Sequence, residues 1–215
     1  MSERAGTTPP VPVTGEPLAL ELVNTTFIDG GLRGHLVDAL CTPAHLDEWM
    51  TNHLEWFSPD LQPLASGAVC DQDALDRFLE LRSALRACLT TVTLGNALDL
   101  AATMIVNRFA AKGAFRLELI PGEPVTVRRR WPTNDPCTIA LAEIATDACA
   151  VLLPDRIGKI KVCPAPGCIL FFEKSHPRRE WCSPACGNRV RVARHTRTAN
   201  QSHITTATGK PESGL

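Results

Sequence analysis

Several features that decide the class of a protein are missing from this sequence. It has no run of eighteen or more apolar residues, the length that a membrane-spanning helix requires, so we expect no membrane association. Residues 1–16 contain Pro, Thr and Gly but not the apolar stretch of a secretory signal, and we interpret them as a disordered leader. We recognise no nucleophile–base pair and no phosphate-cradling loop, so we do not expect an enzyme.

Cysteine is abundant, but its arrangement argues against a disulfide framework. The nine cysteines are an odd number, and without a secretion signal they favour a reducing, cytoplasmic setting. Five of them are scattered among apolar residues, and we expect these to behave as small buried side chains. The five are Cys41, Cys70, Cys88, Cys137 and Cys149.

The formal net charge of −1 conceals an asymmetry along the chain. Residues 1–155 carry 11 Lys and Arg against 20 Asp and Glu, a net charge of −9, whereas residues 156–198 carry 10 against 2, a net charge of +8. A basic module joined to an acidic body indicates a polyanionic partner such as nucleic acid. The alternative is that the two halves attract each other, which requires no nucleic acid.

Helical periodicity dominates the first part of the chain. Thr42 and Pro43 suit the N-cap and the first position of a helix, and Arg82 falls on the solvent-facing side of the longest helical segment. Residues 26–40 have a glycine-rich centre and are predicted to form a loop. Residues 17–25 suit either a strand or a short helix, and we favour the helix. Helices are also predicted over residues 42–57, 71–95, 97–111 and 137–154.

The hydrophobic period changes from 3.6 to 2 in the middle of the chain. FRLELI (115–120) and VTVRRR (125–130) alternate and flank a Pro-Gly turn, which predicts a β-hairpin. The predicted fold class is therefore α+β. We expect a mainly helical N-terminal domain with a small antiparallel hairpin over 17–155, a treble-clef-like zinc finger over 156–198, and a disordered tail over 199–215.

Cys163, Cys168, Cys182 and Cys186 form two closely spaced pairs. Zn²⁺ takes four soft ligands in a tetrahedron, and two tight turns that face each other supply them. The proline and glycine residues within and beside each pair favour such turns. Four cysteine ligands leave no open position for water, so we predict one structural zinc ion and no catalytic one.

The residues around the cysteines suggest how the finger folds. The apolar residues 169–172 and Trp181 flank a polar, proline-containing turn, and we expect them to form a hairpin that shields one side of the metal. Good helix formers follow Pro184, so Cys186 should lie in the first turn of a helix. Four basic residues are expected to offset the negative charge of the thiolates: Lys161, Arg178, Arg179 and Arg189.

The string WCSPACGNRVRVARH (181–195), preceded by CPAPGC (163–168), strongly resembles the CGNR zinc-finger family of bacterial proteins. PLALELVNT (17–25), with DALCTP and LDEW after it, resembles the ABATE domain that lies upstream of that finger. The last two cysteines are one residue closer together than in many members. The resemblance implies a stress-related transcription regulator whose finger binds DNA.

The basic side chains of the finger are the candidates for DNA contact, because arginine bonds phosphates and guanine edges. Trp181, Gly187 and Asn188 are expected to support the structure, Gly187 by allowing close approach to the metal and Asn188 by bonding thiolates or backbone. The candidate DNA-binding residues are Arg178, Arg179, Arg189, Arg191, Arg194, His195 and Arg197.

The N-terminal domain carries less specific signals. In a regulator it would bind a small-molecule effector or form a homodimer. Trp49 and Trp56, seven residues apart, are expected in the core. A different function for the whole chain also stays open: the basic finger could be a protein–protein module that binds an acidic partner, or it could bind RNA.

Overall fold

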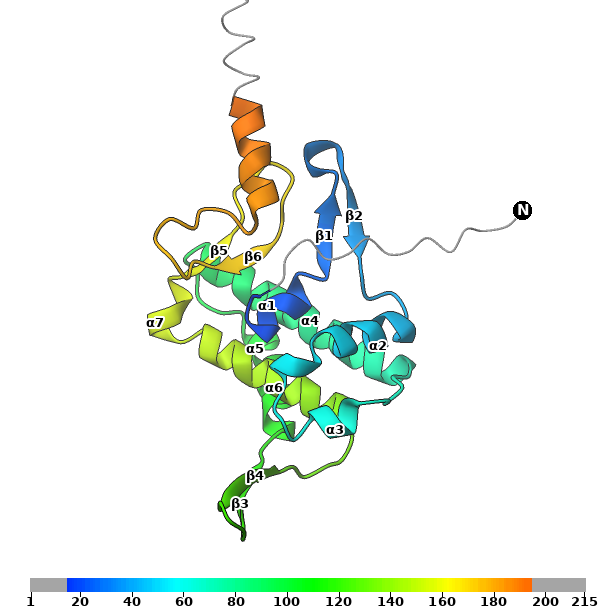
Figure 1. Ribbon diagram of the computed structural model, residues 1–215. Helices are drawn as coiled ribbons and strands as arrows, with labels where there is room; N and C mark the ends of the chain where they lie inside the picture. Colours follow the sequence, from blue (N-terminus) through cyan, green and yellow to red (C-terminus); the bar gives the residue numbers. More distant parts are fainter. Residues whose placement is uncertain (1–14, 195–215) are drawn as a thin grey trace, which may run out of the picture.

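Four helices form the body of the protein, and each buries an apolar stripe. A computed structural model describes residues 15–194, and Figure 1 shows these helices packed together. They are α2 (Pro43–Asn52), α4 (Gln72–Thr93), α5 (Leu100–Lys112) and α6 (Pro136–Val151). Helix α6 lies at the centre of the core, where it packs on α4 and α5 and keeps Ile139 and Ile144 fully buried.

The starts of the long helices follow from their caps. Thr42, Asp71, Asp99 and Asp135 each accept a backbone N–H bond from the first turn, which stabilises that end of the helix. The first long helix is shorter than predicted, because α2 ends at Asn52 and a 3-10 turn follows. The remaining short helices are α1 (Leu18–Val23), η2 (Leu54–Trp56), α3 (Gln62–Ala65) and α7 (Pro154–Ile157). Across residues 15–194, no helix has the length and apolar character needed to cross a membrane.

Residues 26–40 form a hairpin, so the prediction of a loop here is wrong. Strand β1 (Thr26–Asp29) pairs antiparallel with β2 (His35–Asp38), and the 3-10 turn η1 (Gly31–Arg33) joins them. Gly30 and Gly31 have φ values of 84° and 68°, which glycine adopts without strain. The strands have four residues each, too few for their alternation to stand out beside the glycine-rich turn.

Two further hairpins complete the fold. Strands β3 (Arg116–Ile120) and β4 (Thr126–Arg130) pair as the sequence predicts. Strand β5 (Ile160–Val162) pairs with β6 (Phe171–Glu173), so the hairpin expected between residues 169 and 181 is wrong. Pairing with β5 carries Phe171 into the main core, which an isolated hairpin in the finger would not do.

Two charged side chains lie inside the protein although the sequence placed them in solvent. Arg82 is 9% exposed and donates to both carboxylate oxygens of Asp38 at 2.6 Å. Burial disfavours the charged form of Asp38, but the hydrogen bonds from Arg82 and from the backbone N–H of Leu40 outweigh burial and hold its pKa below the ordinary value. Glu16, assigned to the disordered leader, is also buried.

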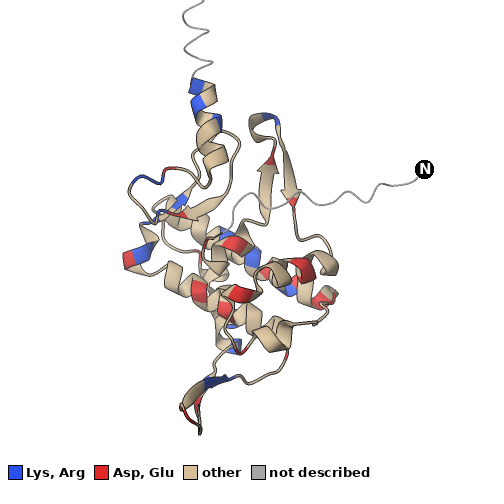
Figure 2. Ribbon diagram, viewed as in Figure 1, with Lys and Arg blue, Asp and Glu red and all other residues tan. Residues whose placement is uncertain are grey.

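Charge is distributed unevenly over the surface. Figure 2 shows acidic positions gathered over the helical body, whereas basic positions mark the end of the helix that begins at Pro184 and the tip of the β1–β2 hairpin. We call the helix over residues 184–194 the C-terminal helix. It projects from the same side of the body as the β1–β2 hairpin (Figure 1). The rest of the predicted leader, 1–14, and the predicted tail, 199–215, lie outside the described residues.

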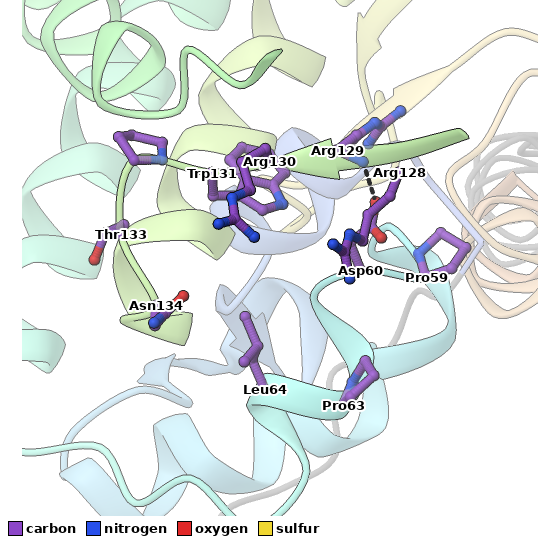
Figure 3. A pocket seen from close by; sticks show the side chains of 11 residues that line it. Pro59, Asp60, Pro63, Leu64, Arg128, Arg129, Arg130, Trp131, Thr133 and Asn134 are labelled. Atoms are coloured by element: carbon purple, nitrogen blue, oxygen red, sulfur yellow. Dashed lines mark hydrogen bonds between the residues drawn. The ribbon is translucent and has the colours of Figure 1, made fainter. Parts of the chain in front are cut away.

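A cavity of about 620 Å³ lies beside β4, at the end of the molecule away from the C-terminal helix. Four residues of the segment 59–64 and residues 128–134 line it (Figure 3). Asp60 accepts a hydrogen bond from the backbone N–H of Arg129 at 3.0 Å and so joins the two walls. Arg130 is exposed and forms no ion pair within residues 15–194.

Candidate metal centre and its basic helix

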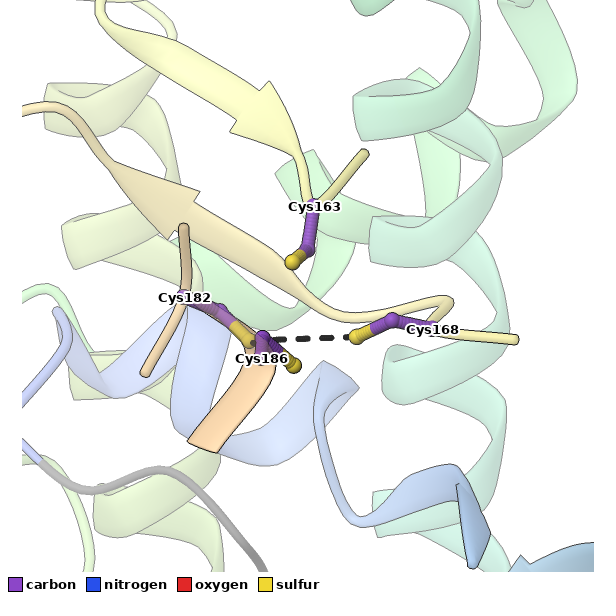
Figure 4. Close-up of side chains that lie close together, drawn as sticks. All are labelled: Cys163, Cys168, Cys182 and Cys186. Carbon is purple, nitrogen blue, oxygen red and sulfur yellow. Dashed lines mark hydrogen bonds between the residues drawn. The ribbon is translucent and has the colours of Figure 1, made fainter. Parts of the chain in front are cut away.

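The four cysteines of the two pairs converge on one point. Their Sγ atoms all lie within 4.8 Å of one another, and Figure 4 shows Cys163, Cys168, Cys182 and Cys186 gathered from both turns. Sulfur atoms placed tetrahedrally at about 2.3 Å from Zn²⁺ are about 3.8 Å apart. The Sγ of Cys182 lies 3.8 Å from that of Cys168 and 3.5 Å from that of Cys186. The site fits one zinc ion held by four cysteines, as the spacing predicts.

The electrostatics of three of these thiols also favour a bound cation. Hydrogen bonds from its neighbours lower the pKa of Cys163 to about 2. Hydrogen bonding to Cys163 raises the pKa of Cys168 to about 12 and raises that of Cys182 as well. Without a cation, the hydrogen bonds that stabilise the thiolate of Cys163 therefore keep its neighbours Cys168 and Cys182 protonated. A divalent zinc ion stabilises all four thiolates together, and with no open position left it is structural.

Local hydrogen bonds fix the two cysteine turns. The backbone N–H of Cys168 donates to the carbonyl of Ala165 at 3.0 Å and closes the first turn. Ser183 caps the C-terminal helix, because its Oγ accepts the backbone N–H of Cys186 at 3.3 Å, and Pro184 takes the first helical position. Cys186 therefore lies in the first helical turn, as predicted.

Two residues of the CGNR string differ in role from what the sequence suggested. A Cβ at Gly187 would lie 3.0 Å from Cδ1 of Trp181, so this glycine makes room for the indole ring and not for the metal. Asn188 is exposed, and its Oδ1 accepts a hydrogen bond from Arg191 instead of bonding a thiolate. Trp181 packs against the core of the finger, which contains Cys182 and Cys186.

Arg189 lies between the two cysteine pairs. Its Nη1 donates to the carbonyl of Pro166 at 3.2 Å, and its Nη2 lies 3.7 Å from Sγ of Cys186. The guanidinium therefore offsets part of the negative charge on the thiolates. Lys161 and Arg178, expected in the same role, are exposed and contact no sulfur in the described part of the chain.

Arg179 is held within the protein. It pairs with Glu16, donates to the carbonyls of Glu173 and Cys182 at 3.0 Å, and lies over the ring of Phe172. Glu16 also accepts the backbone N–H of Glu173 at 2.8 Å, although burial raises its pKa. Attraction between the acidic body and the basic finger, the alternative raised by the charge asymmetry, accounts for this arginine.

The finger packs on the helical domain through contacts that the sequence did not reveal. The side chain of Asn24 accepts the backbone N–H of Phe171 at 2.9 Å and donates to its carbonyl at 2.8 Å, so it bonds the edge of β6 as a neighbouring strand would. Phe27 and Val37 of the β1–β2 hairpin face the metal site. They share a small core with Cys163, Ala165, Leu170, Phe172, Cys182, Cys186 and Val190.

The C-terminal helix turns basic side chains outward. Val190 packs into the small core, whereas Arg191 and Arg194 are exposed on the helix. The candidate DNA contacts therefore differ in their exposure to solvent. Arg178 is also exposed, Arg179 and Arg189 are engaged inside the protein, and His195 and Arg197 lie outside the described residues.

The scattered cysteines only partly follow the expectation of burial. Cys70 and Cys137 are buried, as is Cys88, but Cys41 and Cys149 are exposed, which contradicts the prediction for them. The Sγ atoms of Cys70 and Cys137 lie 3.4 Å apart, a proximity that nothing in the sequence signals because the two are far apart along the chain.

Comparison with known families gives two matches, one after the other along the chain. Residues 16–154 match the ABATE family, described as "Putative stress-induced transcription regulator", and residues 159–198 match the CGNR zinc finger. No curated protein sequence matched the chain. The ABATE match covers more than half of the chain, and the finger follows it with its four cysteines clustered. The chain therefore belongs to the ABATE family and carries a CGNR zinc finger after the ABATE match.

Proposed function

We propose that this protein is a transcription regulator that binds duplex DNA through its C-terminal helix. The observation that carries the proposal is a pair of exposed arginines, Arg191 and Arg194, on a helix whose first turn is fixed by a closed four-cysteine site. Guanidinium groups bond phosphate oxygens and guanine edges. Because the zinc site has no open position, its contribution is to hold this helix in place.

The shape of the helix fits the proposed partner. An α-helix with its side chains is about 10–12 Å wide, close to the width of the major groove of DNA. The C-terminal helix stands away from the body, so a duplex can approach it without meeting the acidic helices (Figures 1 and 2). The family description supports the regulatory part of the proposal. The nine unpaired cysteines support a reducing, cytoplasmic setting.

Fluorescence anisotropy with a labelled duplex tests the proposal. The double variant Arg191→Ala/Arg194→Ala should bind at least about tenfold more weakly, because it loses two charge-assisted contacts. The control Lys112→Ala/Arg116→Ala removes the same charge at the end of α5 and the start of β3, and should bind as the wild type does. Zinc content should be equal in all three proteins. Equal affinity of the two double variants would refute the role of the helix.

Two competitors separate the alternatives. Single-stranded RNA that displaces the duplex at lower concentration than DNA would favour RNA binding. Polyglutamate that displaces the duplex at equal charge concentration would favour an acidic protein partner. We expect unlabelled duplex DNA to compete best, because only a duplex offers a groove to the helix.

We propose further that the N-terminal domain senses a small anionic effector in the cavity beside β4. Arg130 offers an exposed guanidinium there, and the buried indole N–H of Trp131 has no acceptor among the described residues. Inorganic phosphate and citrate are suitable probes. Either should raise the melting temperature of the wild type but not of Arg130→Ala, and an equal rise in both proteins would refute the site.

Dimerisation is the other role proposed for this domain. Leu119 and Val127 lie opposite each other on the β3–β4 hairpin and are 72% and 60% exposed. An apolar cross-strand pair in solvent is suited to cover by a second copy of the chain. Sedimentation should show a dimer that Leu119→Lys converts to a monomer. A monomeric wild type would refute this role.

A further inference from the structure

The tip of the β1–β2 hairpin is fixed to the zinc finger by a close backbone contact. Gly167, in the first cysteine turn, has φ +70°, and a Cβ there would lie 2.3 Å from the carbonyl carbon of Gly31. Arg189 supports the same contact, because a Cβ at Gly31 would meet its Nη1 at 3.0 Å. The tip and the first cysteine turn are therefore in close contact, although they lie far apart along the chain.

The outward face of this tip is open to solvent. Leu32 and Leu36 are 75% and 66% exposed, which is unusual for large apolar side chains beside a folded core. Arg33 and His35 are exposed as well, and neither side chain has a hydrogen-bond or ion-pair partner within residues 15–194. The tip thus presents one free guanidinium between two leucines.

The tip lies on the side of the molecule from which the C-terminal helix projects (Figure 1). Figure 2 shows basic positions on both elements and acidic positions mainly on the body behind them. The hairpin itself carries two acidic residues, Asp29, which is exposed at the end of β1, and Asp38 of β2, which pairs with Arg82. A duplex bound to the helix would therefore meet the tip before it meets the acidic body.

We propose that the tip of the β1–β2 hairpin is a second DNA-binding element, which places Arg33 in the minor groove next to the groove that holds the C-terminal helix. Arginine is the side chain that a narrow minor groove attracts, and proteins that bind this groove insert apolar side chains such as leucine between base steps, a role open to Leu32 and Leu36. The ABATE domain thereby contributes directly to DNA binding, and the finger is only one half of the interface. The inference rests on the proposed function of the helix.

Anisotropy and salt dependence of the full chain on a duplex test the inference. Arg33→Ala should weaken binding about three- to tenfold, and it should reduce the magnitude of the slope of log affinity against log salt by about 0.9. Asp29→Asn should strengthen binding, because it removes a negative charge that faces the same duplex. Arg116→Ala, which removes one charge from the distant β3–β4 hairpin, should leave both quantities unchanged.

Hydroxyl-radical footprinting supplies a second measurement that does not depend on affinity alone. At saturating protein, Arg33→Ala should lose protection on one side of the wild-type footprint while protection at the helix site persists. If Arg33→Ala and Asp29→Asn behave as the wild type while Arg191→Ala/Arg194→Ala loses binding, the tip proposal is wrong and the helix proposal stands. If the wild type binds no duplex at all, both proposals are wrong.

Discussion

Asn24 provides a sharp test of how the finger is attached to the helical domain. Its side chain is fully buried and satisfies both backbone groups of Phe171. Asn24→Ala would leave a buried N–H and a buried C=O without partners, and each costs about 1–3 kcal/mol. We therefore expect the free energy of unfolding to fall by about 3–4 kcal/mol. In a chain of 215 residues this corresponds to a melting temperature about 6–16 °C lower.

Urea denaturation monitored by circular dichroism, with excess zinc present, measures the loss. Asn107→Ala is the matched control, because Asn107 is exposed on α5 and alanine favours the helix there. The control should change the free energy of unfolding by less than about 0.7 kcal/mol. Zinc content should stay at one ion per chain in both variants, since neither changes a ligand. A loss below about 1 kcal/mol for Asn24→Ala would refute the reasoning that these two hydrogen bonds join the domains.

Two further predictions concern the metal and the pH dependence. Removing zinc with a chelator should increase hydrogen exchange in β1 and β2 as well as in the finger, because Phe27 and Val37 share the core of the metal site; unchanged exchange in the two strands would contradict that shared core. Asp38 has a lowered pKa in the folded state, so its stabilising effect is present above the ordinary carboxyl value of 3.8 and is lost as the pH falls through the folded value. Asp38→Asn should therefore be less stable than the wild type at pH 7, and in acid denaturation curves the difference should begin to shrink only as the pH falls below about 4. A difference that is constant with pH would mean that the Arg82–Asp38 pair does not act through charge.

The sequence was sufficient for features that depend on local spacing. The two cysteine pairs predict the metal site because each pair lies on one tight turn. The long helices are predicted by the helical spacing of their apolar residues and by N-cap residues such as Thr42 and Asp71. The alternation of apolar and polar residues over 115–130 predicts the β3–β4 hairpin, because this pattern too is local in the sequence.

Features that depend on distant partners were not predictable in this way. Within its own helix, Arg82 has the position of a solvent-facing residue. Its burial is explained by its hydrogen bonds to Asp38, which lies on the β1–β2 hairpin. Asn24 bonds a strand that lies 147 residues further along the chain. Likewise, the sequence does not distinguish Arg179 from the exposed arginines of the finger, because the difference is its ion pair with the distant Glu16. Each of these misses is a long-range contact between polar groups, which carries no periodic signal.

We propose above that a closed zinc site holds a basic helix for binding to duplex DNA. The most direct measurement is the affinity of the full, zinc-loaded chain for a duplex over a series of salt concentrations. With about five to seven phosphate contacts, log affinity should fall linearly with log salt with a slope of about −5. Absence of binding to any duplex at low salt, or a slope near zero, would contradict the claim.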